Sequence, residues 1–177
     1  MPRSSLDRVS GTSENREIEQ ALVINLRDAP ARRHPRRASI IELEPHGARW
    51  ADTGINVRVM EPGQPSGRYH CEPHQEDFLE LRGQCIAIVD ERELALRQWD
   101  LLHCPAGAAH VLIGAGAEPC AVVMIGSRRR QRTHYPLSAA AARYGASVSS
   151  PTDEPAEAYA DWRREPWQPA ADVWPFA

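Results

Sequence analysis

Four side chains that commonly bind metal ions occupy every second position of one short stretch of the chain: His70, Glu72, His74 and Glu76. In a β-strand, side chains two residues apart point to the same face. The spacing therefore aims imidazole and carboxylate groups at one point, as a metal site requires. Pro73 interrupts the alternation, so the sequence leaves open whether all four groups converge.

A further imidazole, His110, follows the turn Pro105-Ala106-Gly107 and is expected to begin a new strand. We take it as a second source of ligands to the same site. His103, on the strand before that turn, is interpreted as a structural or surface residue, because a lone imidazole on a strand is more often hydrogen-bonded than metal-bound.

The elements that must position these residues are short strands. Between residue 39 and about residue 127, alternating or β-branched segments are separated by Gly, Pro and Asp turns, and no helical period intervenes. This pattern predicts an all-β sandwich or barrel. The expected strands are Ile40–Leu43, Ile55–Met60, Asp77–Leu81, Cys85–Val89, Leu94–Leu96, Leu101–Cys104, His110–Ile113 and Cys120–Ile125.

Two flanking regions differ from this barrel region, residues 39–127. Residues 1–38 are expected to be a partly disordered tail, in which Ala21–Leu26 could add an edge strand. Residues 128–177 are expected to form short helices and extended chain that pack on the barrel or on a partner subunit. Ser138 would cap a helix over Ala139–Tyr144, and Thr152 or Asp153 a second helix through about Arg164. Aromatic residues that would provide the cover are Tyr159, Trp162, Trp167 and Trp174.

Composition excludes several classes of function. The 177 residues carry a formal net charge of −3, which gives a nucleic-acid partner no support. The longest apolar run, Ala121–Ile125, is far shorter than the roughly 20 residues of a membrane span. The start of the chain lacks the apolar region of a secretory signal, and the four cysteines have no CxxC spacing. We therefore expect a cytoplasmic protein with reduced, buried thiols.

Two segments carry a family resemblance. The stretch from Pro62-Gly63 through His70-Cys71-Glu72 and Glu76 to Gly83 resembles the first motif of the cupin superfamily, a Gly, then His-x-His, then Glu, then six residues and a Gly. The stretch Asp100–His110 resembles the second motif, Gly-Asp-x4-Pro-x-Gly-x2-His. The two motifs occur in order, separated by a hairpin-sized insert, and the chain is similar to small single-domain cupins of the type-2 kind.

This resemblance implies a double-stranded β-helix, or jelly-roll, barrel that holds one divalent metal ion. Mixed His and Glu ligands suit Zn, Fe, Mn or Ni. By position, His70, Glu76 and His110 match family ligands. Glu72 stands where a second His is usual, which would make a set of two His and two Glu, unless His74 supplies the missing imidazole. The resemblance also suggests a homodimer.

Three further positions depart from the pattern. Trp99 replaces the Gly before Asp100, Gly114 stands where Asn often closes the second motif, and Glu80 occupies a position that is usually apolar. On a regular strand, Glu80 would face the same interior as Glu76, where a buried carboxylate needs a partner or a raised pKa.

Two functions follow from these expectations. The first is a metal-dependent enzyme of the isomerase or dioxygenase class acting on a small polar metabolite, with Glu72, Glu76 or Glu80 as candidates for proton transfer. The second is a non-catalytic binding or sensor module, in which the barrel takes a small molecule. The fold alone does not choose between them.

Overall fold

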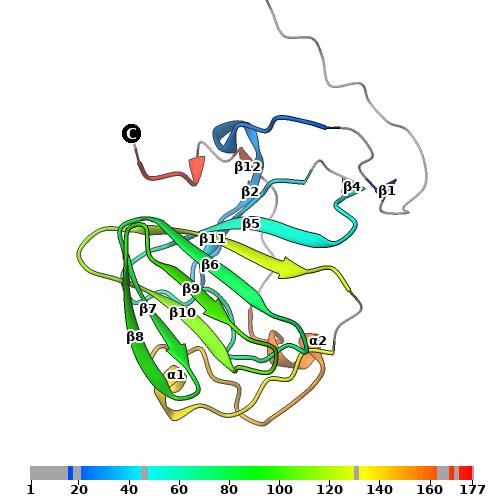
Figure 1. The fold of residues 1–177 in the computed structure, drawn as a ribbon. Coiled ribbons are helices and arrows are strands. Elements are labelled where there is room, and N and C mark those ends of the chain that lie inside the picture. Colours follow the sequence, from blue (N-terminus) through cyan, green and yellow to red (C-terminus); the bar gives the residue numbers. More distant parts are fainter. Residues whose placement is uncertain are drawn as a thin grey trace, which may run out of the picture.

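The computed structural model describes residues 16–17, 21–44, 48–129, 132–162, 168–169 and 172–176, and within these ranges the chain is mainly β-strand (Figure 1). In chain order the elements are β1 (Arg16–Glu17), the 3-10 helix Leu26–Asp28, β2 (Pro30–Arg32), β3 (Ser39–Glu42), β4 (Ala48–Arg49), β5 (Thr53–Met60), β6 (Glu76–Arg82), β7 (Gln84–Val89), β8 (Arg92–Arg97), β9 (Leu101–Cys104), β10 (His110–Ala115), β11 (Cys120–Ser127), α1 (Ala139–Ala142), α2 (Pro155–Ala158) and β12 (Gln168–Pro169).

Two sheets form the barrel. One has the strand order β12-β2-β3-β5-β11-β6-β9, and the other has the order β10-β7-β8; every pairing within them is antiparallel. The main apolar cluster draws side chains from both sheets, including Met60, Phe78, Ala87, Leu112 and Val122. The two sheets therefore close around a shared interior, as in a jelly roll, and the all-β fold expected from the sequence is confirmed.

All eight strands expected from the alternating segments are present, as β3 and β5 to β11. Local turn chemistry explains why their ends are so well defined. Asp90 and Glu91 connect β7 to β8 with φ values of 46° and 65°, the left-handed conformation that a two-residue hairpin turn requires. Asp90 is suited to this position, since Asp tolerates the left-handed region better than most residues.

The edge strand that Ala21–Leu26 could add does not form. Residues 21–25 form no regular element, Leu26–Asp28 is a 3-10 helix, and Val23 is 95% exposed. The added strand is β2 instead, where Ala31 pairs with Ile41 of β3 and is completely buried. Burial against β3, rather than the apolar character of the segment itself, decides which residues join the sheet.

Both C-terminal helices begin near their expected positions, and both are shorter than expected: α1 ends at Ala142 rather than at Tyr144. Ser138 caps α1, its hydroxyl accepting a hydrogen bond from the Ala141 amide at 2.9 Å. α2 covers Pro155–Ala158 only, with Pro at its first position, and Glu154 is its N-cap. Neither Thr152 nor Asp153 is the N-cap of α2, although the Thr152 hydroxyl accepts a hydrogen bond from the Glu154 amide at 3.1 Å.

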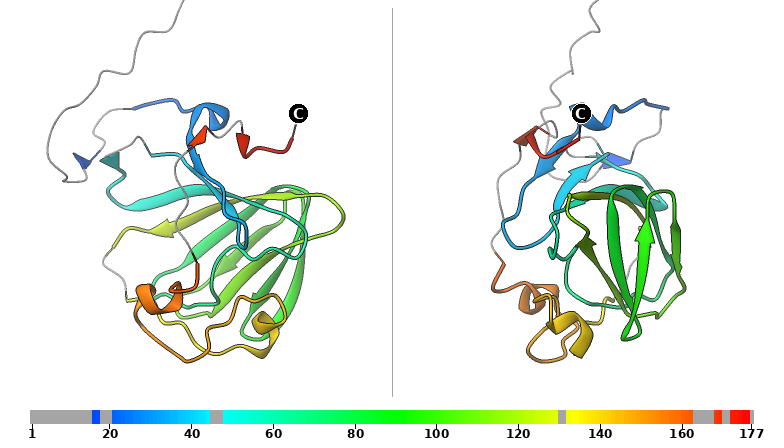
Figure 2. Two further views of the ribbon diagram at one scale, coloured as in Figure 1. Left: turned by 180° about the vertical axis from the view of Figure 1, so that it is seen from behind. Right: turned by 90° about the vertical axis from the view of Figure 1, so that its left-hand side faces the viewer.

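The terminal segments cover the outer face of the larger sheet. Val57 and Val59 of β5 pack outward in a cluster with Ala31 and with Val173 near the C-terminus. β2 and β12 lie at one end of the molecule, and α1 and α2 lie at the opposite end (Figure 2). Trp162 is buried and stacks on the Arg68 guanidinium at 4.2 Å, whereas Trp167 lies outside the described residues.

The structure also bears on the expected state of the cysteines and on membrane-spanning helices. The cysteines form no disulfide, and Cys85, Cys104 and Cys120 are buried in the interior cluster. In the part of the chain that the structure describes, no helix has the length and apolar character needed to cross a membrane.

Candidate metal centre

Two histidines from distant parts of the sequence face each other across a backbone bridge. His70 and His110 exchange hydrogen bonds through their main chains, with N–O distances of 3.1 and 2.8 Å. His110 is the first residue of β10, and the turn before it is held by the Gly107 amide, which donates to the Glu72 carbonyl at 2.8 Å. The two imidazole rings lie 4.9 Å apart.

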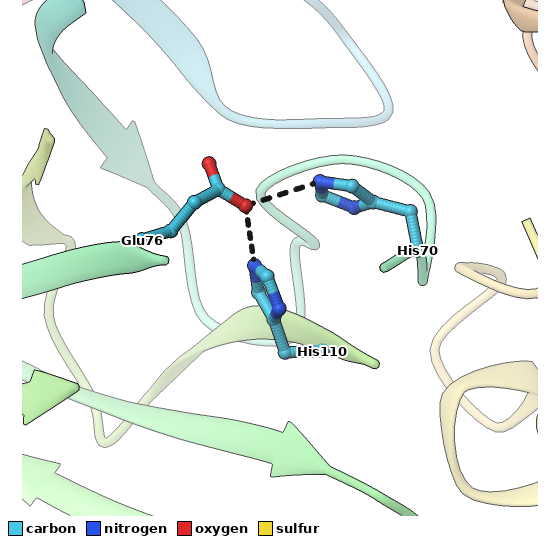
Figure 3. A group of neighbouring side chains, drawn as sticks. All are labelled: His70, Glu76 and His110. Atoms are coloured by element: carbon cyan, nitrogen blue, oxygen red, sulfur yellow. Dashed lines mark ion pairs between the residues drawn. The ribbon is translucent and has the colours of Figure 1, made fainter. Parts of the chain in front are cut away.

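Glu76, the first residue of β6, completes the group (Figure 3). Its Oε2 atom lies 3.0 Å from His110 Nε2 and 3.6 Å from His70 Nε2. Gly126 of β11 lies opposite Glu76, and a Cβ atom at that position would approach Glu76 Oε1 to 3.2 Å. Among the described residues, one ligand atom from each of these three side chains lies within 4.8 Å of the others.

The hydrogen bonds of the two rings show which atoms face Glu76. His70 Nδ1 donates to the Arg68 carbonyl at 2.8 Å, and His110 Nδ1 donates to the Ala108 carbonyl at 3.0 Å. Because a carbonyl only accepts, each ring carries a proton on Nδ1, and the Nε2 atom of a neutral ring then presents a lone pair.

These donors fit a cation. Glu76 Oε2 and His110 Nε2 are buried and have no hydrogen-bond partner, although they lie only 3.0 Å apart. Electron-pair donors that converge without a well-aligned hydrogen bond between them match the coordination of a divalent ion by two imidazoles and a carboxylate. Each Nδ1–H is bound to a carbonyl, which is how proteins orient metal-binding imidazoles.

The electrostatics of the group favour added positive charge. Burial opposes protonation of His70, but the Glu76 carboxylate outweighs it and raises the pKa of His70. Burial also opposes ionisation of Glu76, but the two imidazoles lower the pKa of that carboxyl to about 2. The site therefore attracts a proton or a metal ion, and the two compete for it.

Glu72 and His74 lie outside this group of three. The chain turns between residues 72 and 75, so the alternation breaks at Pro73 and the four residues do not lie on one continuous strand. Glu72 Oε1 lies 3.8 Å from His70 Nε2 and accepts a hydrogen bond from Thr133 Oγ1 at 3.3 Å. His74 is half-buried and joins no cluster of ligand atoms among the described residues.

Glu80 and His103 are placed away from the group. Glu80 faces the barrel interior, as expected, but it does not line the cavity, and Phe78 stands between it and Glu76 on the inner face of β6. His103 is exposed and its Nδ1 atom lies 2.6 Å from Asp77 Oδ1.

The metal-ligand group opens on a cavity of about 390 Å³, a size suited to a small molecule. The walls include side chains that the sequence pattern does not assign to the site. These are Arg37, Asn56, Arg58, Ser66, Ser127, Arg128, Tyr135 and Tyr159. The only local signal for Asn56 and Arg58 is that they are polar residues alternating with apolar ones on β5, which is also what a solvent-facing position shows.

Comparison with known proteins agrees with the fold. Residues 56–126 match the Cupin domain family, and no curated protein sequence is significantly similar to the chain. An uncharacterized conserved protein with a double-stranded β-helix domain from Klebsiella pneumoniae superimposes with a TM-score of 0.53 at 17% identity, over 64% of this chain and 96% of that one. The polyketide cyclase RemF from Streptomyces resistomycificus superimposes with a TM-score of 0.54 at 12% identity, over 63% of this chain and 84% of that one.

A sugar phosphate isomerase of the cupin superfamily from Silicibacter pomeroyi has 23% identity and a TM-score of 0.49, over 54% of this chain. The match spans 63% of that protein, less than two thirds of its length. At these identities the similarities concern the fold and not the reaction. The family match, the jelly-roll topology and the group His70, Glu76 and His110 together show that this chain carries a cupin domain.

Proposed function

We propose that this protein binds one divalent metal ion through His70, Glu76 and His110 and uses it in chemistry on a small polar metabolite, of the isomerase or dioxygenase class. The observation that carries the proposal is the convergence of two Nε2 atoms on one buried carboxylate oxygen at the wall of a small-molecule cavity. When bound, the ion supplies a Lewis-acidic or redox-active centre next to the substrate.

Glu72 is our candidate for proton transfer. It lines the cavity beside His70 without joining the group of three. Burial and the neighbouring Glu76 carboxylate raise the pKa of Glu72. A carboxylate with a raised pKa accepts a proton from a substrate more readily than an exposed one, so Glu72 is our candidate general base.

Metal analysis of the purified protein and of three variants tests the metal site. We expect about one equivalent of Zn, Fe, Mn or Ni in the native chain and loss of that metal in His70→Ala and His110→Ala. His103→Ala is the matched control, because its exposed ring is bound to Asp77, and it should retain the metal. A native protein with less than about a tenth of an equivalent after reconstitution would contradict the proposal.

The loaded protein then distinguishes the two reaction classes. We would follow oxygen uptake with an electrode and isomerisation by NMR over a panel of small hydroxylated carbonyl compounds. Uptake that is lost in His110→Ala would indicate a dioxygenase, and isomerisation without uptake an isomerase. Binding without turnover would favour a sensor module. The homodimer stays a prediction, which the molecular mass in solution tests.

A further inference from the structure

A half-buried arginine with two buried, unpartnered guanidinium nitrogens lies in the wall of the cavity. Arg58, on β5, has its Nε and Nη1 atoms buried, and neither has a hydrogen-bond partner. No described residue forms an ion pair with Arg58 within 4 Å. Burying an unpaired charge is strongly unfavourable, so a bound anion that pairs with such a group would stabilise it.

Another arginine, Arg68, is buried as a whole and shows that this fold can satisfy a guanidinium. Arg68 Nε donates to the Ala158 carbonyl at 2.9 Å, and its Nη1 donates to the carbonyls of Gly145 and Ser147 at 2.9 and 3.0 Å. Its Nη2 pairs with Asp161. Arg68 is therefore structural, and it does not line the cavity. Arg58 has none of these partners, although it does line the cavity.

The charges around Arg58 leave it cationic and without compensation at close range. Burial lowers the pKa of Arg58 to about 10, which keeps it protonated at neutral pH. The nearby Arg37 adds positive charge, and it also lines the cavity. Glu42 and Glu76 attract Arg58 only from beyond ion-pair distance. The potential at this wall therefore favours an anion.

Asn56 provides a second polar group on the same face. It lies two residues before Arg58 on β5, so both side chains point to the same side of the sheet, and both line the cavity. Asn56 Oδ1 is also buried without a partner. The same cavity is lined by His70, Glu76 and His110.

We propose that Arg58, with Asn56 beside it, binds the oxyanion group of a small molecule, a carboxylate or a phosphate, whose other end reaches the metal-ligand group. This inference rests on the proposed function in one respect, that the cavity is the substrate site. The guanidinium neutralises and orients the anion, and the anion supplies the partner that the buried charge lacks. The substrate class is therefore a small organic acid or a phosphate ester.

Isothermal titration calorimetry of the metal-free protein with inorganic phosphate and with malonate tests this subsite, at constant ionic strength set by chloride. Metal-free protein is used so that neither anion binds through the ion. We expect saturable binding at one site, weakened at least about tenfold in Arg58→Gln. Tighter binding of phosphate would identify a phosphate ester, and tighter binding of malonate an organic acid.

The matched control is Arg92→Gln, which removes the same charge from an exposed position on β8 outside the cavity. It should bind both anions as the native chain does. Unchanged binding in Arg58→Gln would overturn the proposal, and so would the absence of saturable binding of either anion to the native chain.

Two further measurements cover other outcomes. If Arg58→Gln does not fold, the Nε–H resonance of Arg58 in the native protein must shift on addition of the tighter-binding anion while that of Arg92 does not; equal shifts would refute the subsite. Metal content separates the two proposals. Since Arg58 is not a ligand, Arg58→Gln should retain the metal, and a native chain that binds metal but no anion would refute only the subsite.

Discussion

Glu80 is a carboxyl group buried where the barrel offers it almost no compensation. Its side chain is 0% exposed and faces the interior cluster from β6. Neither carboxyl oxygen has a hydrogen bond of good geometry. Burial raises the pKa of Glu80 to about 7, although the Cys85 thiol and the backbone of Ala121 and Arg82 lie near enough to oppose the shift weakly. Glu80 should therefore hold a proton in the folded protein when an exposed Glu would not.

The shift predicts how stability depends on pH. In the unfolded chain Glu80 ionises near its ordinary pKa of 4.5, whereas in the folded chain it stays protonated until about pH 7. The folded state therefore binds more protons between these values, and the free energy of unfolding falls as pH rises through that window. At about 1.4 kcal/mol per pKa unit, the full penalty above pH 7 is about 3 kcal/mol.

Replacing Glu80 by Gln removes the ionisable group and keeps the shape. We expect Glu80→Gln to change the free energy of unfolding little at pH 5 and to raise it by up to about 3 kcal/mol at pH 8.5. Urea denaturation of both proteins across this range measures the difference. Glu118→Gln, at an exposed position, is the matched control and should give no such pH dependence. An equal effect of Glu80→Gln at both pH values would refute the reasoning.

Three other substitutions test local features by urea or thermal denaturation. Trp99 is 69% exposed and has φ of 76°, so Trp99→Gly should stabilise the fold by about 1 kcal/mol, and a loss of stability would contradict the strain. Gly114→Ala should cost at least about 2 kcal/mol, because the new Cβ would lie 2.3 Å from the Glu61 carbonyl oxygen; a neutral result would mean that the backbone can move there. Ser138→Ala should cost about 1 kcal/mol through loss of the hydrogen bond that caps α1, whereas Ser138→Thr should keep most of it.

Much of the fold could be predicted from the sequence because its signals are local. Strand alternation and the intervening turn residues identify all eight barrel strands. The two departures from the motif at Trp99 and Gly114 also have local explanations. Trp99 occupies a left-handed position that favours glycine, and Gly114 stands where the backbone of Glu61 leaves no room for a side chain.

The metal-ligand group could be predicted only in part. His70, Glu76 and His110 were expected from their motif positions, and the structure brings them together. The reason for their convergence differs from the expected one, since a backbone bridge pairs His70 with His110 and a turn returns the chain to Glu76. No alternation within one segment could reveal this, because the bridge joins residues forty positions apart.

The proposed oxyanion subsite could not be predicted from the sequence, for a more general reason. An alternating strand such as β5 is ordinarily interpreted with its valines inside and its polar residues in solvent. Here Val57 packs outward, and it is buried there because Ala31 and Val173, from the two ends of the chain, cover the sheet. Because the terminal segments cover the outer face of the sheet, the valines of β5 can be buried there while Arg58 on the opposite face lines the cavity. The terminal segments are thus what allows this barrel to turn a polar face inward, and a buried charge on that face needs a partner that the described residues do not supply.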